Sequence, residues 1–152
     1  MLHIGDTAPE FMLPDKDEQQ VALRSYTQDR VVIFFYPKDN TPGCALETKG
    51  FNELAQEFQK NNIGVIGISG GDAASKTSFC EKVGKEVKLL SDTNFSVCEK
   101  YGVYGEKKFM GRTYMGINRI TFIIDKDRKV IKVYDEVKPA VHPKEVLNYL
   151  VK

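Results

Sequence analysis

The 152-residue sequence has no excess of one charge, no long apolar run and no secretory leader, and each absence excludes a class of protein. Its 22 basic and 21 acidic residues leave a net charge of +1, which argues against a nucleic-acid or membrane-lipid surface. The longest strongly apolar run, residues 31–36, is far too short to span a bilayer. The first residues, MLHIGDTAPEF, lack the basic and apolar stretches of a signal peptide, so we expect a cytoplasmic protein.

Cysteine is also scarce. Cys44, Cys80 and Cys98 are too few and too scattered for a disulfide framework, so we expect free thiols in a reducing compartment. No Cys-x-x-Cys pair is present, which argues against both a zinc site and a thioredoxin-type disulfide reductase. The two histidines, His3 and His142, make no metal-ligand spacing, so the sequence predicts no metal site.

The rest of the chain has the composition of an ordinary globular protein, with 41% hydrophobic and 28% charged residues. No repeat and no linker rich in Pro, Gly or Ser divides it, and its length leaves no room for a second full domain. We therefore expect one domain over residues 1–152.

Strands and helices alternate along the sequence. Residues 31–36 and 63–69 are apolar without alternation, which is typical of strands buried on both faces. Apolar residues at helical spacing between them predict a helix over 42–60, and this β-α-β order implies a parallel pair with a right-handed crossover. The remaining expected elements are a helix over 72–83 capped by Asp72, a strand at 87–90, a helix over 93–101, an antiparallel hairpin of 119–124 and 130–134, and a final helix over 143–151.

Residues 1–30 carry two prolines and short apolar patches, so they predict an N-terminal extension with a small added hairpin. The whole pattern belongs to the α/β class. It predicts a thioredoxin-like fold, in which a central mixed β-sheet is flanked by helices.

One predicted helix start, directly after a buried strand, is a candidate reactive site. In the stretch VVIFFYPKDNTPGCALET, Thr41 is a good N-cap, Pro42 suits the first helical position, and Cys44 is then third. Free backbone N–H groups and the helix macrodipole favour an anion there, so they favour the thiolate. A capped helix start with a small buried thiol fits the spacing equally well.

The same stretch, YPKDNTPGCALE, resembles the active-site motif of the peroxiredoxins, and it is closest to their bacterioferritin-comigratory or Q-type subgroup. GDTAPEFMLPD, LLSD, YGVYGEKK and YMGINRITFIID fit that subgroup in order, so the resemblance extends over nearly the whole chain. It implies a thiol peroxidase that reduces hydrogen peroxide and organic hydroperoxides without a metal or organic cofactor.

The resemblance also implies roles for five residues. Cys44 would be the peroxidatic residue, with the Thr41 hydroxyl hydrogen-bonded to the peroxide and Pro42 shielding the sulfur from water. Arg119 would hold the thiolate and polarise the peroxide, and Glu47 would support Arg119. On sequence alone, an arginine beside a hairpin is more often a solvated surface charge, and an acid on the first turns of a helix is simply favoured by the macrodipole.

Reversing the oxidation of Cys44 needs a second thiol. Many members of the subgroup carry it five residues after the first cysteine, where this chain has Lys49. Other members place the second thiol on the next helix, which makes Cys80 the expected resolving residue. The alternative is that Cys80 is only a small residue of the core. Cys98 is better explained as a buried thiol that packs in the core than as a resolving residue.

We further expect the Cys44–Cys80 disulfide to require local unwinding of helix. The implied reductant is thioredoxin or a similar dithiol protein, and the expected assembly is a monomer or a weak homodimer. Residues 101–117 are expected to form a loop near the site or a dimer contact. Two alternatives remain: a one-cysteine peroxidase that uses an external thiol, and a non-catalytic thioredoxin-like redox-sensing or binding module.

Overall fold

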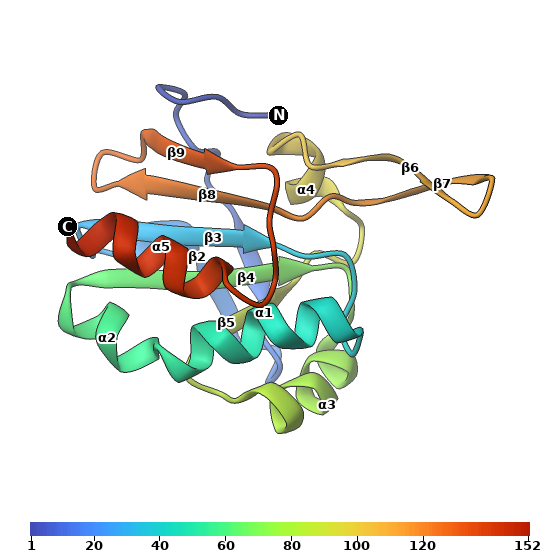
Figure 1. Ribbon diagram of the computed structural model, residues 1–152, viewed down its shortest axis with the longest axis horizontal. Coiled ribbons are helices and arrows are strands. Elements are labelled where there is room, and N and C mark those ends of the chain that lie inside the picture. Colours follow the sequence, from blue (N-terminus) through green and yellow to red (C-terminus); the bar gives the residue numbers. More distant parts are fainter.

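The computed structural model describes residues 1–152, and Figure 1 shows the order of the elements. The strands are β1 (Met12–Pro14), β2 (Gln20–Ala22), β3 (Arg30–Phe35), β4 (Ile63–Ser69), β5 (Lys88–Ser91), β6 (Tyr104–Phe109), β7 (Arg112–Ile117), β8 (Ile120–Asp125) and β9 (Val130–Tyr134). The helices are α1 (Pro42–Glu53), α2 (Ala55–Lys60), α3 (Ala73–Val83), α4 (Ser96–Lys100) and α5 (His142–Val151), with a 3-10 turn η1 (Leu23–Ser25). None of the helices has the length and apolarity needed to cross a membrane.

The central sheet has five strands in the order β5-β4-β3-β8-β9. The β3, β4 and β5 strands run parallel, whereas β8 is antiparallel to both β3 and β9. This is the mixed sheet of a thioredoxin-like fold, so the predicted α/β class is confirmed. The β1 and β2 strands pair separately as the small N-terminal hairpin that the sequence predicted.

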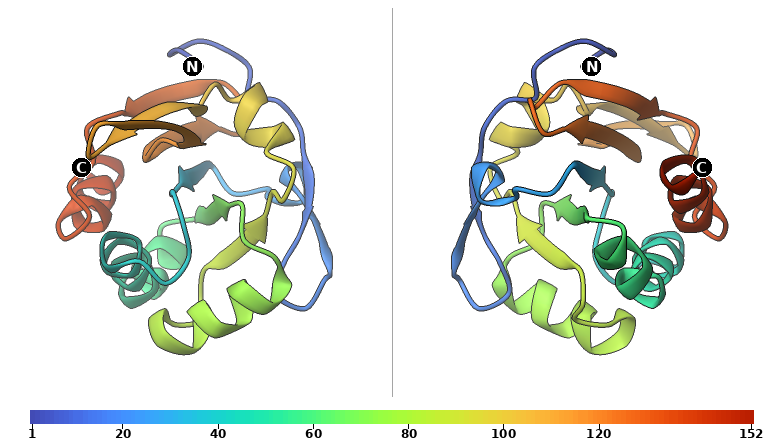
Figure 2. Two further views of the ribbon diagram at one scale, coloured as in Figure 1. Left: turned by 90° about the vertical axis from the view of Figure 1, so that its right-hand side faces the viewer. Right: turned by 90° about the vertical axis from the view of Figure 1, so that its left-hand side faces the viewer.

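The apolar β3 strand lies in the middle of the central sheet, between β4 and β8. Its side chains alternate between two hydrophobic clusters, one on each face of the sheet. The helices α1, α2, α3 and α5 cover one face, and α4 with the N-terminal segment covers the other (Figure 2). Residues 31–36 are all fully buried, which explains why the run lacks polar alternation.

Two helix boundaries differ from the prediction. The expected single helix over 42–60 is broken at Leu54, whose φ and ψ of −97° and 6° leave the helical range, so the prediction of one helix was wrong there. The expected helix over 93–101 is shortened to α4 because Phe95 adopts a left-handed conformation with a φ of 61°. The predicted cap of α3 is confirmed, since Oδ1 of Asp72 accepts a hydrogen bond from the Ser75 N–H at 2.9 Å.

Residues 104–117 form an antiparallel hairpin of β6 and β7, which extends away from the body of the molecule in Figure 1. Its two turn residues, Met110 and Gly111, both have positive φ, as a tight two-residue hairpin turn requires. The expected loop is therefore a regular hairpin. Four large apolar side chains on it are exposed: Phe109, Met110, Tyr114 and Met115.

Candidate active site

The α1 helix begins as its sequence predicts. Thr41 occupies the N-cap with extended backbone, Pro42 is the first helical residue, and Cys44 is the third. The first intrahelical bond runs from the N–H of Ala45 to the carbonyl of Thr41 at 2.9 Å. The N–H groups of Gly43 and Cys44 therefore have no acceptor within the helix, and the positive end of the helix dipole lies at the sulfur.

Thr41 occupies the predicted N-cap position, but the expected side-chain cap was wrong, because its hydroxyl makes no hydrogen bond to the first turn of α1. Its hydroxyl donates to the carbonyl of Lys38 at 2.8 Å, across the turn that leads into α1. Pro42 is exposed, whereas Cys44, two residues later in the same helical turn, is fully buried.

Arg119 joins the sulfur to a buried carboxyl. One guanidinium nitrogen, Nη2, lies 3.3 Å from Sγ of Cys44, and the other, Nη1, donates to Oε1 of Glu47 at 2.7 Å. Arg119 comes from the connection between β7 and β8, and Glu47 lies one turn after Cys44 on α1. The structure thus brings together three residues that the sequence singled out. Their arrangement is suited to stabilising negative charge on the sulfur and on an oxygen beside it.

Gly43 makes room for this contact. A Cβ atom at that position would lie 3.1 Å from Nη2 of Arg119 and 3.6 Å from Cγ of Pro139. A larger residue would press on the guanidinium and move it from the sulfur. Sequence reasoning missed this role, although a glycine between Pro42 and Cys44 was a visible signal.

Burial controls the protonation of the pair. It raises the pKa of the Glu47 carboxyl to about 7, although the charge and hydrogen bond of Arg119 lower it. Burial alone would lower the pKa of Arg119, but the Cys44 sulfur and the Glu47 carboxyl together raise it. The second Glu47 oxygen, Oε2, is buried without a hydrogen-bond partner. Such an unsatisfied oxygen penalises the ionised carboxyl.

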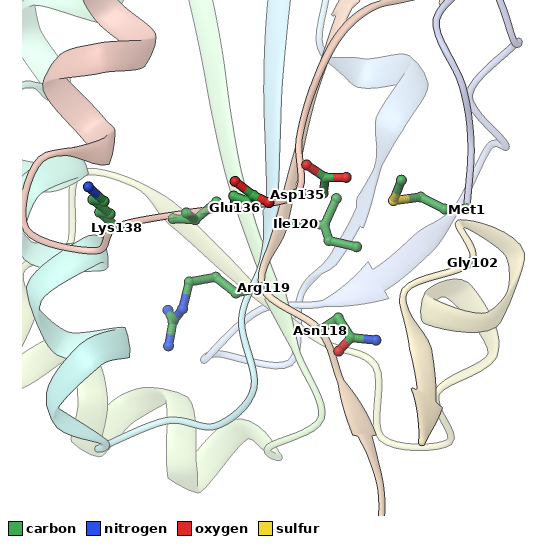
Figure 3. A pocket seen from close by; sticks show the side chains of 9 residues that line it. Met1, Gly102, Asn118, Arg119, Ile120, Asp135, Glu136 and Lys138 are labelled. Carbon is green, nitrogen blue, oxygen red and sulfur yellow. The ribbon is translucent and has the colours of Figure 1, made fainter. Parts of the chain in front are cut away.

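An open depression of about 710 Å³ lies beside Arg119. Figure 3 shows its wall: Asp135, Glu136 and Lys138 follow β9, and the Arg119 side chain points away from Met1 toward α1. Cys44 does not line this depression. Arg119 lines the depression with 19% of its side chain exposed and also contacts the buried sulfur, so the Cys44 site adjoins the depression through Arg119.

Cys80 lies on the same side of the sheet as Cys44. Both belong to the hydrophobic cluster beneath α1 and α3, and both are free thiols. Burial raises the pKa of the Cys80 thiol, while the nearby Lys16 lowers it. A small cavity of about 30 Å³ adjoins Cys80, and its lining includes the side chains of Lys16, Lys85 and Lys88.

Cys98 lies on the opposite face of the sheet, in the cluster formed with α4 and the N-terminal segment. Its thiol is fully buried, and burial together with Asp92 raises its pKa. The sheet therefore separates Cys98 from Cys44. No group of three metal-binding side chains is found in the chain.

Replacing Arg119 tests its contact with the sulfur. The peroxiredoxin resemblance implies that Cys44 reacts with peroxide. On that interpretation we expect Arg119→Met to slow the reaction by about 100-fold, because a donor that stabilises developing charge is lost. Arg119→Lys should recover only part of the rate, since lysine restores charge without the planar two-nitrogen geometry. Rapid-quench measurement of peroxide consumption gives both rates.

The matched control for this experiment is Arg30→Met, since Arg30 is exposed at the opposite end of β3. Arg30→Met should react like the wild type. If Arg119→Met also reacted at the wild-type rate, with its fold verified by circular dichroism, the contact of Arg119 with the sulfur would have no part in the reaction.

Glu47→Gln tests the protonation of the buried carboxyl. The folded-state pKa of about 7 exceeds the value of 4.5 for a free glutamate, so the folded protein holds this proton more tightly than the unfolded chain. The resulting stability is fully present below pH 4.5 and is lost as the pH rises through 7. Between pH 4.5 and 8 the wild type should lose about 3 kcal/mol of unfolding free energy relative to Glu47→Gln. Denaturant unfolding of both proteins across this range measures the difference, and parallel pH profiles would contradict it.

Comparisons with known proteins identify the family of the chain. The AhpC/TSA family model matches residues 4–133. Peroxiredoxin Bcp of Escherichia coli K12 is 45% identical over 149 residues, which cover 98% of this chain and 96% of that protein. A crystal structure of PrxQ from Xylella fastidiosa superposes with a TM-score of 0.91 at 35% identity, covering 99% of this chain and 96% of that one.

A structure of the bacterioferritin comigratory protein from Xanthomonas campestris superposes with a TM-score of 0.85 at 34% identity. It covers 92% of this chain and 89% of that one. The family match, the near-complete coverage and the thioredoxin-like sheet lead to the same assignment. The chain belongs to the AhpC/TSA family and is a peroxiredoxin of the bacterioferritin-comigratory, or PrxQ, type, an enzyme that reduces peroxides with a thiol.

Proposed function

We propose that Cys44 is the peroxidatic residue. The observation that carries this proposal is the Arg119 guanidinium, which contacts both Sγ of Cys44 and the Glu47 carboxyl. The Cys44 thiolate attacks one peroxide oxygen and breaks the O–O bond, so sulfur gains that oxygen as a sulfenic acid. The other oxygen leaves with the electron pair of the bond, takes a proton and departs as water or an alcohol. Arg119 stabilises the charge on both atoms during the transfer.

The neighbouring residues have supporting roles in this proposal. The Thr41 hydroxyl, now bonded to the Lys38 carbonyl, turns to a peroxide oxygen when substrate enters. Pro42 keeps bulk water from the sulfur, and Glu47 holds Arg119 in place. These roles follow from the order of the residues at the start of α1 and from the contacts of Arg119.

The substrate class we propose comprises alkyl hydroperoxides and hydrogen peroxide. The Xanthomonas campestris bacterioferritin comigratory protein is described as having alkyl peroxide reduction activity. The depression beside Arg119 is open to solvent and large enough for a small alkyl group. We propose that substrate approaches from this side.

Cys80 is the proposed resolving residue. Its thiol attacks the sulfenic sulfur of Cys44, so that an S–S bond forms and water leaves. Two of the Xanthomonas campestris PrxQ structures carry serine at cysteines that are 36 residues apart, which is also the separation of Cys44 and Cys80. Cys80 shares the Cys44 side of the sheet, whereas Cys98 does not.

Forming this disulfide requires movement. A disulfide holds its two Cα atoms about 4.4–6.8 Å apart, whereas packed helices have axes about 8–10 Å apart. Cys44 is in the first turn of α1 and Cys80 is in the last turns of α3, with both helices intact in the reduced protein. We propose that part of one helix unwinds and then presents the disulfide to a thioredoxin-like dithiol protein. A single domain in the cytoplasm suits this cycle, because a reducing compartment supplies the electrons.

Steady-state turnover tests the proposed cycle. The purified protein should consume alkyl hydroperoxide continuously when thioredoxin, its reductase and NADPH are supplied. Turnover with a small monothiol alone, and none with thioredoxin, would favour a one-cysteine peroxidase. Consumption of no more than one equivalent with either reductant would favour a redox-sensing module.

A further inference from the structure

The α3 helix carries a fully buried lysine. The Lys76 side chain has 0% exposure, and its ammonium group donates three hydrogen bonds. The acceptors are Oδ2 of Asp39 at 2.9 Å, Oγ of Ser69 at 2.7 Å and the carbonyl of Gly71 at 3.2 Å. All three ammonium protons thus have acceptors, which is the condition under which a buried charge is tolerated.

Asp39 is the centre of this network. Its side chain is 1% exposed, and both carboxylate oxygens accept two hydrogen bonds each. Oδ1 accepts from the Tyr36 hydroxyl at 2.6 Å and from Ser69 at 3.3 Å, and Oδ2 accepts from Lys76 and from the Ser75 hydroxyl at 2.6 Å. We call Tyr36, Asp39, Ser69, Ser75 and Lys76 the Lys76 network.

The network leaves no space for a side chain at Gly71. A Cβ atom there would lie 2.2 Å from Oδ2 of Asp39 and 2.7 Å from Oγ of Ser75. The segment that follows β4 therefore closes directly over the carboxylate. The hydrogen bonds of Asp39 and Lys76 thus hold three segments of the chain in close contact: the segment that follows β3, the end of β4 and the start of α3.

The position of the network relates it to both reactive cysteines. Asp39 lies five residues before Cys44, in the segment that leads from β3 to α1. Lys76 lies four residues before Cys80, on the same face of α3. The network therefore ties the segment before one thiol to the helix that carries the other. Any unwinding of α3 from Ala73 to Cys80, or any shift of the segment before Cys44, separates Lys76 from Asp39.

We propose that Lys76 is a positioning residue that, through Asp39, holds the Cys44 segment against α3 and sets how often oxidised Cys44 reaches Cys80. This inference rests on the proposed pairing of Cys44 with Cys80. The closed network favours the folded form, in which Arg119 contacts the sulfur and peroxide reacts. Opening of the network permits the disulfide.

The network thereby sets the competition between two fates of the Cys44 sulfenic acid. With the Cys80 thiol it gives a disulfide and water. With a second hydrogen peroxide it gives a sulfinic acid and water, and this product leaves the cycle. Slower opening of the network gives the second reaction more time.

The Lys76→Met/Asp39→Asn variant tests the proposal. The double change removes the ion pair without leaving a buried charge alone, and the new amide retains an acceptor for the Tyr36 hydroxyl. We expect the rate constant of disulfide formation to rise by about fivefold and the sulfinic fraction at high peroxide to fall correspondingly. The reaction of reduced Cys44 with peroxide should stay within about twofold of the wild type, because a fivefold rise in a rare opening leaves the folded form dominant. Rapid quench with mass spectrometry follows each species.

Ser75→Ala is a milder second variant, since it removes only one hydrogen bond to Asp39. It should change the disulfide rate in the same direction by a smaller factor, and it keeps the test decisive if the double variant does not fold. Hydrogen exchange on the reduced proteins should show reduced protection over residues 73–83 in each variant that folds.

The control is Ile124→Ala, which creates a cavity on the opposite face of the sheet and lowers stability without touching the network. Its disulfide rate and sulfinic fraction should match the wild type. Unchanged values in Ser75→Ala and in the folded double variant would overturn the role of Lys76, and so would an equal change in Ile124→Ala. Failure of the wild type to form any Cys44–Cys80 disulfide would instead overturn the proposed resolving step.

Discussion

The rate of peroxide reduction by purified Cys44→Ser is expected to fall by at least about 10⁴-fold. An alcohol is not ionised near neutral pH and has no reversible oxidation cycle, so serine supplies neither the nucleophile nor the sulfenic acid. The fold should persist, because serine has nearly the size of cysteine and the helix start does not depend on the sulfur. Peroxide consumption with thioredoxin, its reductase and NADPH measures the loss.

The control for Cys44→Ser is Cys98→Ser, since Cys98 is equally buried but lies across the sheet. Cys98→Ser should retain wild-type turnover. Measurable turnover by Cys44→Ser would show that another group attacks the peroxide, and the assignment of Cys44 would then be wrong.

Cys80→Ser is expected to separate the two halves of the cycle. Its Cys44 should still react once with peroxide at the wild-type rate, because Arg119 and Glu47 remain in place. Steady turnover with thioredoxin should fall by roughly two orders of magnitude, because no internal thiol converts the sulfenic acid to a disulfide. A single-turnover assay and a steady-state assay on the same preparation measure both effects.

Two outcomes would contradict this expectation. Full thioredoxin-dependent turnover by Cys80→Ser would make Cys80 a packing residue of the α3 helix. Loss of the first reaction as well would indicate that Cys80 shapes the Cys44 site instead of resolving it.

Much of the fold was predictable because its central strands are buried on both faces. The apolar runs at 31–36 and 63–69 have few alternatives to a buried parallel pair, and the structure places them side by side. The β6–β7 hairpin was not predictable in the same way. Its strands are largely exposed, so they lack the polar and apolar alternation that marks a half-buried strand.

The candidate site was predictable in its local part. The order Thr41, Pro42, Gly43, Cys44 fixes a helix start with a thiol at the third position, and this needs no tertiary information. The contact of Arg119 with Cys44 spans 75 residues, so no local pattern specifies it, and only the family resemblance pointed to it.

The Lys76 network could not be predicted from the sequence. A lysine on a helix is normally solvated, and an aspartate before a helix start suggests a turn. Burial of Lys76 and Asp39 depends on the meeting of the ends of β3 and β4 with α3, which composition and periodicity do not encode. Glycine at position 71 was the one visible signal, because its missing side chain permits the close approach.

The identity of the oxidised product tests the account most directly. The reduced wild-type protein is treated with one equivalent of peroxide, its remaining thiols are blocked, and it is digested without reductant for peptide mass spectrometry. The account predicts that the main product is a peptide pair joined through Cys44 and Cys80, with Cys98 recovered as a blocked thiol. A Cys44–Cys98 pair, or Cys44 recovered without any partner in the chain, would contradict it.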